Sequence, residues 1–170
     1  MNLIRVNKVL VLLILGIVTS YTLQAQKRAS PMKYVDQSLG DVNLKIAYSS
    51  PSVKGRTIWG DLVPYDKVWR TGANEATVFE VSADCTVNGE KLKKGKYALF
   101  TIPNEKSWTV IINSVWDQWG AYKYDSSKDV LRFNVKPSQS SMTEAFTIAA
   151  SEAGVVSLAW DKLKVSFEVK

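Results

Sequence analysis

The stretch YALFTIPNEKSWTVII, from Tyr97 to Ile112, decides the fold class. Its two apolar runs, 97–102 and 108–112, are separated by the turn-forming residues 103–106. Both runs are rich in β-branched and aromatic residues, and both are shorter than a typical helix. Short runs that are apolar on both faces are typical of buried strands. The stretch therefore predicts a β-hairpin in the middle of a sheet.

Outside this hairpin, apolar and polar residues alternate with a period of two, which predicts strands with one face in water. The pattern covers 44–49, 79–82, 131–136 and 163–170. The sequence Val87-Asn88-Gly89-Glu90 contains the Asn-Gly pair of a tight hairpin turn. Asp161-Lys162 is predicted to turn the chain from a strand over 155–160 into the last strand. We predict an all-β fold, an antiparallel β-sandwich or jelly-roll-like barrel of eight to nine strands.

The first 25 residues are typical of a cleavable secretory signal peptide. Arg5 and Lys8 flank the start of an apolar run over 9–18, and Ala25 suits the position just before a cleavage site. The apolar run is short for a membrane span, which needs about 20 residues. We predict a signal peptide over 1–25, a flexible lead-in over 26–33 and a single β-sandwich domain over 34–170. The mature protein is expected to be periplasmic or secreted, without stable membrane insertion.

The chain contains one cysteine, Cys85, and no histidine. Cys85 cannot form an internal disulfide, and without a histidine partner we expect it to be inert. The missing histidine also excludes Ser-His-Asp catalysis and histidine-ligated zinc. The formal charge of +6 is scattered, and the lysines of 91–96 adjoin a hairpin turn. We therefore expect a solvated sheet edge there, no nucleic-acid partner, and no cofactor or metal.

The stretch RTIWGDLVPYDKVWRTGANEA, from Arg56 to Ala76, is too long for a hairpin turn. Long irregular connections in small domains usually have a functional or structural role. A buried Arg70 without a partner would cost roughly 3–5 kcal/mol, whereas stacking on a tryptophan returns only about 0.5–2 kcal/mol. A buried Arg70 therefore needs a carboxylate of the chain, such as Glu75, or an anion from outside. The first outcome is a structural clamp and the second is a ligand site, and the sequence leaves both open.

A second aromatic cluster follows the central hairpin, with Asp117 and Gln118 between its tryptophans. Aromatic faces beside such polar groups suit a sugar ring, and they equally suit a sandwich edge that is capped by aromatic side chains. We combine both stretches into one predicted ligand-binding site, in which arginines neutralise an anion, aromatic rings stack, and Asn74 and Glu75 orient the ligand. The predicted site consists of Arg56, Trp59, Tyr65, Trp69, Arg70, Asn74, Glu75, Trp116, Trp119 and Tyr122.

The predicted partner is a small anionic or glycan ligand, and a protein partner is also possible. Two other classes of protein stay open. One is a hydrolase that uses a carboxylate pair such as Asp66 and Glu75. The other is an envelope scaffold in which the Arg and Trp residues are a purely structural clamp. No catalytic motif in the sequence assigns an enzymatic activity.

Several motifs occur together in the pattern of a known family. They are Lys54-Gly55-Arg56, Trp59-Gly60, Val63-Pro64-Tyr65, Val68-Trp69-Arg70-Thr71-Gly72-Ala73-Asn74-Glu75, Phe100-Thr101-Ile102-Pro103 and Trp119-Gly120-Ala121-Tyr122. On these residues the chain resembles the bacterial envelope family called domain of unknown function 2911, over about residues 33–170. The resemblance implies a secreted or periplasmic single domain. It implies no catalytic residues, because no activity is assigned to that family.

Overall fold

The hairpin predicted from Tyr97–Ile112 lies in the middle of a sheet. In the computed structural model, which describes residues 28–170, β6 (Gly95–Ile102) pairs antiparallel with β7 (Trp108–Asn113). Most residues of both strands are buried, on both faces of the sheet. The predicted signal peptide over 1–25 and its cleavage after Ala25 lie outside the described residues.

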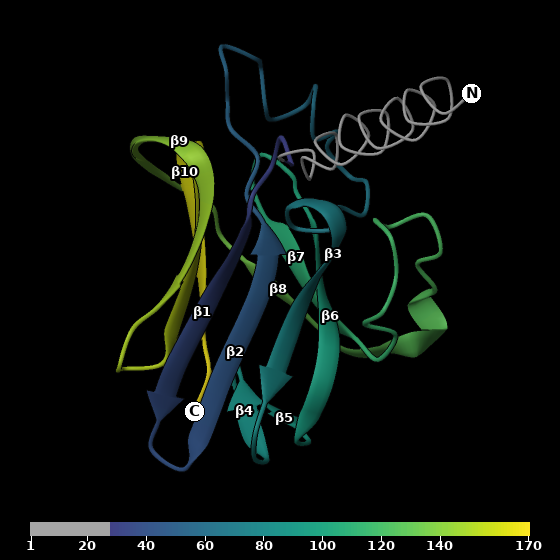
Figure 1. Cartoon of the computed structure of the whole chain (residues 1–170), viewed down its shortest axis with the longest axis vertical. Helices are drawn as coiled ribbons and strands as arrows, with labels where there is room; N and C mark the ends of the chain where they lie inside the picture. Colours follow the sequence, from purple (N-terminus) through teal and green to yellow (C-terminus); the bar gives the residue numbers. More distant parts are fainter. Residues whose placement is uncertain (1–27) are drawn as a thin grey trace, which may run out of the picture.

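The main sheet contains six antiparallel strands in the order β1-β2-β3-β6-β7-β8 (Figure 1). Its other strands are β1 (Met32–Leu39), β2 (Val42–Ser49), β3 (Ala73–Val81) and β8 (Asp129–Val135). β1 begins two residues before the predicted domain boundary at residue 34. The Ser50 N–H donates to the carbonyl of Pro31, so residues within the predicted lead-in already belong to the sheet.

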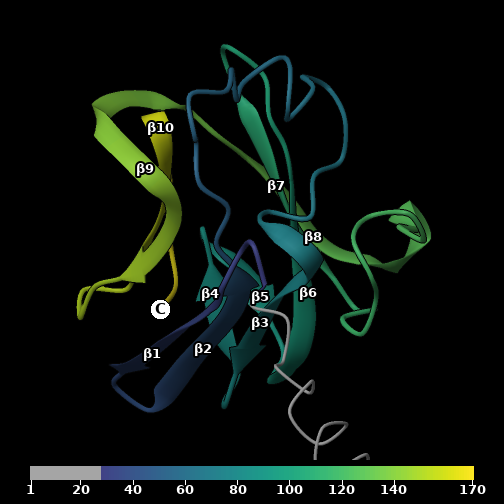
Figure 2. The ribbon, with the colours of Figure 1, turned by 45° about the horizontal axis from the view of Figure 1, so that its top comes forward.

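A long hairpin of β9 (Ser138–Ala150) and β10 (Val155–Glu168) forms a second layer. Figure 2 shows this hairpin and the connection between β7 and β8 on opposite sides of the main sheet. A short hairpin of β4 (Cys85–Val87) and β5 (Glu90–Leu92) joins the end of β10, because Thr86 and Lys170 exchange backbone hydrogen bonds of 2.6 and 2.9 Å. Residues 28–170 therefore form an all-β, sandwich-like fold of ten strands, where eight to nine were predicted.

The core between the layers follows the alternation seen in the sequence. Leu44, Ile46 and Tyr48 of β2 point inward together with Phe79 and Val81 of β3. They pack against inward side chains of the second layer, which include Phe146, Ile148, Val156, Leu158, Trp160, Val165 and Phe167. The Tyr48 hydroxyl also accepts a hydrogen bond of 3.0 Å from the Ile148 N–H. Ser50 Oγ donates to the Phe146 carbonyl at 2.7 Å, so several hydrogen bonds near the end of β2 tie the two layers together.

Four tryptophans meet at one end of this core. Trp59 and Trp69, from the long connection between β2 and β3, insert beside Trp108 and Trp160. Trp59 and Trp108 meet edge to face with centroids 4.8 Å apart, and Trp69 stacks on Trp160 at 5.9 Å and 14°. Edge-to-face and stacked aromatic pairs each add about 0.5–1.5 kcal/mol beyond the area they bury. The connection is therefore clamped to the core by its tryptophans.

Three elements differ from the sequence prediction. β1 was not predicted, because the first alternation recognised in the sequence begins at residue 44. Asp161 does not turn the chain, because β10 runs without a break from Val155 to Glu168. Asp161 adopts a left-handed φ of 53° where the pairing of β10 with β9 shifts register, which marks a bulge. β9 was not predicted at all, since its first residues, Ser138-Gln139-Ser140-Ser141, carry no apolar alternation.

Replacing Trp160 tests the clamp. Trp160 is 2 % exposed, and its indole N–H has no hydrogen-bond acceptor, so its contribution comes from packing alone. We expect Trp160→Ala to lower the free energy of unfolding by about 3–5 kcal/mol, measured by urea denaturation. Trp119→Ala is the matched control, since this indole is 57 % exposed, and it should change stability by about 0.5 kcal/mol or less. Equal losses of stability in the two variants would contradict the role of Trp160 in clamping the connection to the core.

Candidate ligand-binding site

A second, smaller core lies on the outer face of the main sheet, away from β9 and β10. Ala76, Ala98, Phe100 and Ile111 form it. The connection between β7 and β8 covers these residues, with Ala121 and Tyr124 packed on them. The Phe100 and Tyr124 rings meet edge to face at 5.2 Å. The connection over residues 114–128, which we call the outer loop, is thus fixed to the sheet by apolar contacts.

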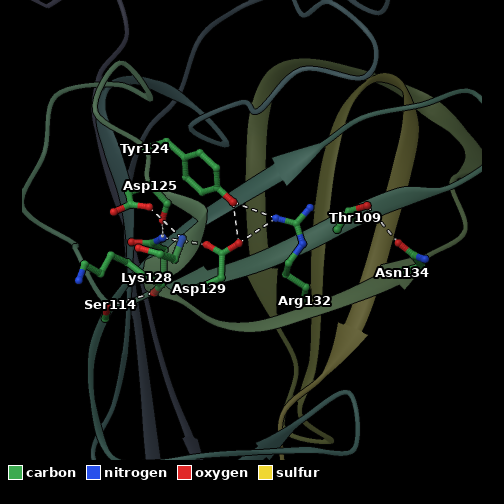
Figure 3. Close-up of polar contacts among 10 residues, drawn as sticks. Thr109, Ser114, Tyr124, Asp125, Lys128, Asp129, Arg132 and Asn134 are labelled. Atoms are coloured by element: carbon green, nitrogen blue, oxygen red, sulfur yellow. Dashed lines mark hydrogen bonds and ion pairs between the residues drawn. The ribbon is translucent and has the colours of Figure 1, made fainter.

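A buried carboxylate fixes the C-terminal end of the outer loop (Figure 3). Asp129 Oδ2 accepts hydrogen bonds from the Tyr124 hydroxyl at 2.6 Å and from Arg132 Nη1 at 2.8 Å. Asp129 Oδ1 accepts a third from Asn113 Nδ2 at 2.8 Å. The Asp129 side chain is only 6 % exposed, so these partners offset the cost of burying its charge. Burial, and then the hydrogen bond to Asp129, raises the pKa of Tyr124 to about 12.

The N-terminal half of the outer loop frames a cleft against β3. The Ala76 N–H donates to the Gln118 carbonyl at 3.0 Å, and Glu75 and Trp119 form a β-bridge. This contact leaves a cleft of about 390 Å³, lined by Glu75, Asp117, Gln118, Trp119, Tyr122 and Lys123. A second hollow of about 260 Å³ adjoins it through Tyr122 and is lined by Val68, Trp69, Arg70, Ala121 and Tyr122. We call the two together the outer cleft.

Aromatic side chains stand in water at the rim of the outer cleft. Trp119 is 57 % exposed and Tyr122 is 83 % exposed. Large aromatic rings are rarely left in solvent side by side unless they contact something else. Neither ring belongs to the small core below, which Ala121 and Tyr124 already fill. Trp119 and Tyr122 are therefore available to a ligand.

Arg70 is a partly buried cation that has no acidic partner among the described residues 28–170. Its Nε is buried and has no hydrogen-bond acceptor, and Arg70 takes part in none of the ion pairs among residues 28–170. Glu75, the partner expected from the sequence, instead pairs with Arg28 at 2.8 Å. The Arg70 guanidinium packs on Gly120, where an added Cβ would lie 2.8 Å from Nη1. The structure thus fixes the position of Arg70 without neutralising it.

The outer cleft brings together half of the predicted site. Arg70, Glu75, Trp119 and Tyr122 line it, and Trp69 lines it while its ring packs in the main core. The remaining residues have other partners. Trp59 packs among the core tryptophans, Arg56 donates to the carbonyls of Ser52 and Val53, Tyr65 packs against Gly60, Asn74 donates to Ser49 Oγ, and Trp116 lies over Lys96.

Three polar residues of the outer cleft were missed by the sequence prediction. Asp117 and Gln118 gave a signal, because they stand between two tryptophans, but they were not included in the predicted site. Lys123 gave none, since a lysine after a tyrosine has no distinguishing pattern. The outer cleft therefore holds two acids, one amide, one lysine and one arginine around its rings.

The two carboxylates suggested as a catalytic pair have separate partners. Asp66 accepts a hydrogen bond of 2.8 Å from Asn104 beside the β6–β7 turn, whereas Glu75 pairs with Arg28. Among residues 28–170, no group of three or more candidate ligand side chains is placed to hold a metal ion. Cys85 is half-buried, and burial followed by the charge of Asp84 raises the pKa of its thiol. None of these groups offers an activated nucleophile or a metal centre in the described part of the chain.

The fold and the cleft define an all-β, sandwich-like domain with an aromatic-rimmed cleft on the outer face of one sheet. Residues 30–169 match the family described as protein of unknown function (DUF2911), and the chain belongs to that family. The match confirms the assignment suggested by the sequence motifs. No curated protein and no solved structure matches the chain. In residues 28–170 there is also no helix long and apolar enough to cross a bilayer.

Substitution of Gly120 tests its contact with Arg70. Gly120 has a left-handed φ of 66°, and an added Cβ would press on Arg70 and on the Tyr122 ring. Gly89→Ala is the matched control, because its φ is 88° and nothing lies within 4 Å of an added Cβ. Both variants should lose about 1–2 kcal/mol of stability for the backbone conformation. Gly120→Ala should lose somewhat more, measured by urea denaturation, and less than the roughly 1–3 kcal/mol of overpacking in a rigid core, because the Arg70 and Tyr122 side chains can shift. Adding Arg70→Ala should recover part of that excess, and no recovery would contradict the contact.

The Tyr124 hydroxyl should make stability depend on pH in the alkaline range. Tyr124→Phe removes a hydrogen bond to a buried carboxylate, so at neutral pH it should lower the free energy of unfolding by about 1–2 kcal/mol. The phenol holds its proton more tightly when folded, with a pKa near 12, than when unfolded, with a pKa near 10.0. Its contribution is complete below pH 10 and is lost as the pH rises toward 12. The stability gap between wild type and Tyr124→Phe should therefore narrow over that range, and a constant gap would contradict this account.

Proposed function

We propose that the protein is a periplasmic or secreted binding module, and that its outer cleft holds a sugar-like ligand that bears a carboxylate. One observation carries the proposal: Arg70 is partly buried, lacks an acidic partner among residues 28–170, and lines a cleft rimmed by exposed aromatic rings. An arginine in this state needs an anion, and Glu75, the partner expected from the sequence, pairs with Arg28 instead. A carboxylate from outside supplies what is missing.

The chemistry of the cleft suits each part of such a ligand. A guanidinium presents parallel N–H donors that match a carboxylate in a two-pronged pair, which is among the strongest hydrogen-bonded contacts in proteins. The Trp119 and Tyr122 rings provide flat apolar faces for the C–H face of a sugar ring. Asp117, Gln118 and Lys123 supply acceptors and donors for hydroxyl groups. A ligand with a carboxylate, an apolar ring face and hydroxyls uses all three sets.

A hydrolase is the second candidate, because Glu75 and Asp117 line one cleft. Two carboxylates across a glycosidic bond are the usual catalytic pair. However, both oxygens of Glu75 lie within 2.9 Å of Arg28 Nη1. Glu75 is thus engaged by a basic side chain of the protein itself. Binding without turnover is therefore the better-supported function.

The proposed location depends on the N-terminal sequence. The basic start, the short apolar run and Ala25 have the pattern of a cleavable secretory signal. An envelope location also suits a ligand of the proposed kind, since acidic glycans and cell-wall fragments occur there.

The binding proposal is tested by calorimetric titration with a panel of disaccharides, each carrying one uronic acid and each paired with its neutral counterpart. We expect at least one acidic member to bind more tightly than its neutral counterpart. Arg70→Gln should weaken that binding by at least about tenfold. Lys162→Gln, which removes one charge from an exposed position in β10, should leave it unchanged.

Two outcomes would contradict the proposal. Equal affinities for acidic and neutral ligands would contradict the role of Arg70, and a failure of every panel member to bind would contradict the binding function.

The stability of ligand-free Arg70→Met distinguishes a ligand site from a structural clamp. Because Arg70 has no partner to lose, this variant should be at least as stable as the wild type. A purely structural clamp predicts a loss of about 3–5 kcal/mol.

A further inference from the structure

All four exposed aromatic side chains of residues 28–170 lie on or over the outer face of the main sheet. Trp119 and Tyr122 belong to the outer cleft, and Trp116 lies between the cleft and β6, with Lys96 Nζ 4.4 Å from its ring centroid. The fourth, Tyr34, projects from β1 and is 76 % exposed. The opposite layer has no exposed aromatic ring in the described part of the chain. The rings therefore mark one face of the molecule.

A groove of about 420 Å³ crosses this face between Tyr34 and Lys96. Its floor includes the small residues Ala47 and Val78. They belong to a row that is in register across four strands, because Tyr34 pairs with Ala47, Ala47 with Val78, and Val78 with the buried Ala98. Strands lie about 4.8 Å apart, so the row spans roughly 14 Å. The small side chains leave a trough, and Tyr34 stands at its end on β1.

Charged residues of alternating sign form the next row across the same strands. Asp36 pairs with Lys45 in register, Lys45 with Glu80, and Glu80 with Lys96. The two ion pairs, Lys45 with Asp36 and Lys96 with Glu80, are both 3.6 Å long and well exposed. Such exposed pairs contribute about 0–1 kcal/mol each, so their donors and acceptors can turn to a ligand at little cost. The groove thus offers an aromatic ring, a flat floor and many hydrogen-bonding groups.

The groove and the outer cleft are parts of one surface. Val78 in the groove floor and Glu75 in the cleft lie three residues apart on β3, which is roughly 10 Å along the strand. Lys96, which lines the groove, carries Trp116, and Trp116 directly precedes the cleft residue Asp117. A polymeric ligand that extends from the cleft past Trp119 would therefore contact Trp116 and then enter the groove.

We infer that this face binds an extended polysaccharide chain, with the carboxylate-bearing unit in the outer cleft and further sugar units along the groove toward Tyr34. This inference rests on the function proposed above. Rows of alternating charge beside one stacking ring suit a hydroxyl-rich polymer, whereas a protein interface core is depleted of charged residues. Addition of a peptide strand would use a sheet edge, and this groove crosses the face of the sheet.

The test is the dependence of affinity on ligand length. The purified protein is titrated with oligomers of galacturonic acid, from the dimer to the octamer, and with the acidic disaccharide that binds best in the panel above. Affinity should rise by at least about tenfold between the shortest and the longest oligomer. Tyr34→Ala should abolish most of that rise and leave the binding of the disaccharide unchanged. Tyr34→Phe, which keeps the ring, should behave as the wild type.

Met142→Ala is the control for loss of an exposed apolar side chain from the opposite layer, and it should have no effect. Affinity that does not change with length, or a Tyr34→Ala variant that keeps the full rise, would overturn the inference while leaving the cleft proposal intact. Loss of the rise in Met142→Ala would also overturn it. If neither the oligomers nor any acidic disaccharide binds, the proposed function itself fails. Thermal unfolding of each variant verifies that the fold is retained.

Discussion

Trp69 and Arg70 are neighbours in extended backbone, and this adjacency couples the core to the outer surface. Successive side chains of such a segment point to opposite faces of the sheet. Trp69 is fixed inside by its stacking on Trp160 and by reciprocal backbone hydrogen bonds with Thr101 of 2.7 and 3.0 Å. Arg70 is therefore held on the outer side, although its charge has no acidic partner among residues 28–170. The packing of Trp69 in the core and the proposed ligand site at Arg70 thus use opposite faces of the same segment.

The same segment explains why a cleft exists at this place. β3 pairs with β6 only from Thr77 to Val81. Toward its beginning the two strands separate, and residues 69–71 fill the gap, with the Thr77 N–H donating to the Arg70 carbonyl. The preceding N–H, that of Ala76, donates instead to the carbonyl of Gln118 in the outer loop. The sheet is thus split at one end, and the hollow arises where the inserted segment, β3 and the outer loop meet.

The parts of the fold that depend on local pattern were predictable from the sequence, and the parts that depend on remote partners were not. The central hairpin and the alternating strands follow from the side-chain periodicity of 97–112, 44–49 and 131–136. The beginning of β9 is serine-rich, and it becomes a strand only because β10 pairs with it. Asp161 misled the prediction because an aspartate tolerates left-handed backbone in a bulge as readily as in a turn.

The candidate site divides for a similar reason. Trp59 and Trp119 are the same residue type in similar surroundings, and only the tertiary fold places one in the core and the other in solvent. Arg56 and Arg70 differ because Arg56 reaches the carbonyls of its own turn, at Ser52 and Val53, while Arg70 has no such local acceptor. Side-chain chemistry in the sequence indicates which residue types suit a ligand, but their exposure is a property of the assembled sheet.

The pairing of Thr86 with Lys170 has a consequence for how the chain reaches its folded state. These residues are 84 positions apart, and their backbone hydrogen bonds attach the β4–β5 hairpin to the end of β10. The second layer is therefore incomplete on the ribosome until the chain has been synthesised through Lys170 and has left the exit tunnel. Long-range β pairing of this kind is slow. The proposed export of this protein would benefit from that delay, because translocation through a narrow channel requires a polypeptide that has not yet acquired its tertiary structure.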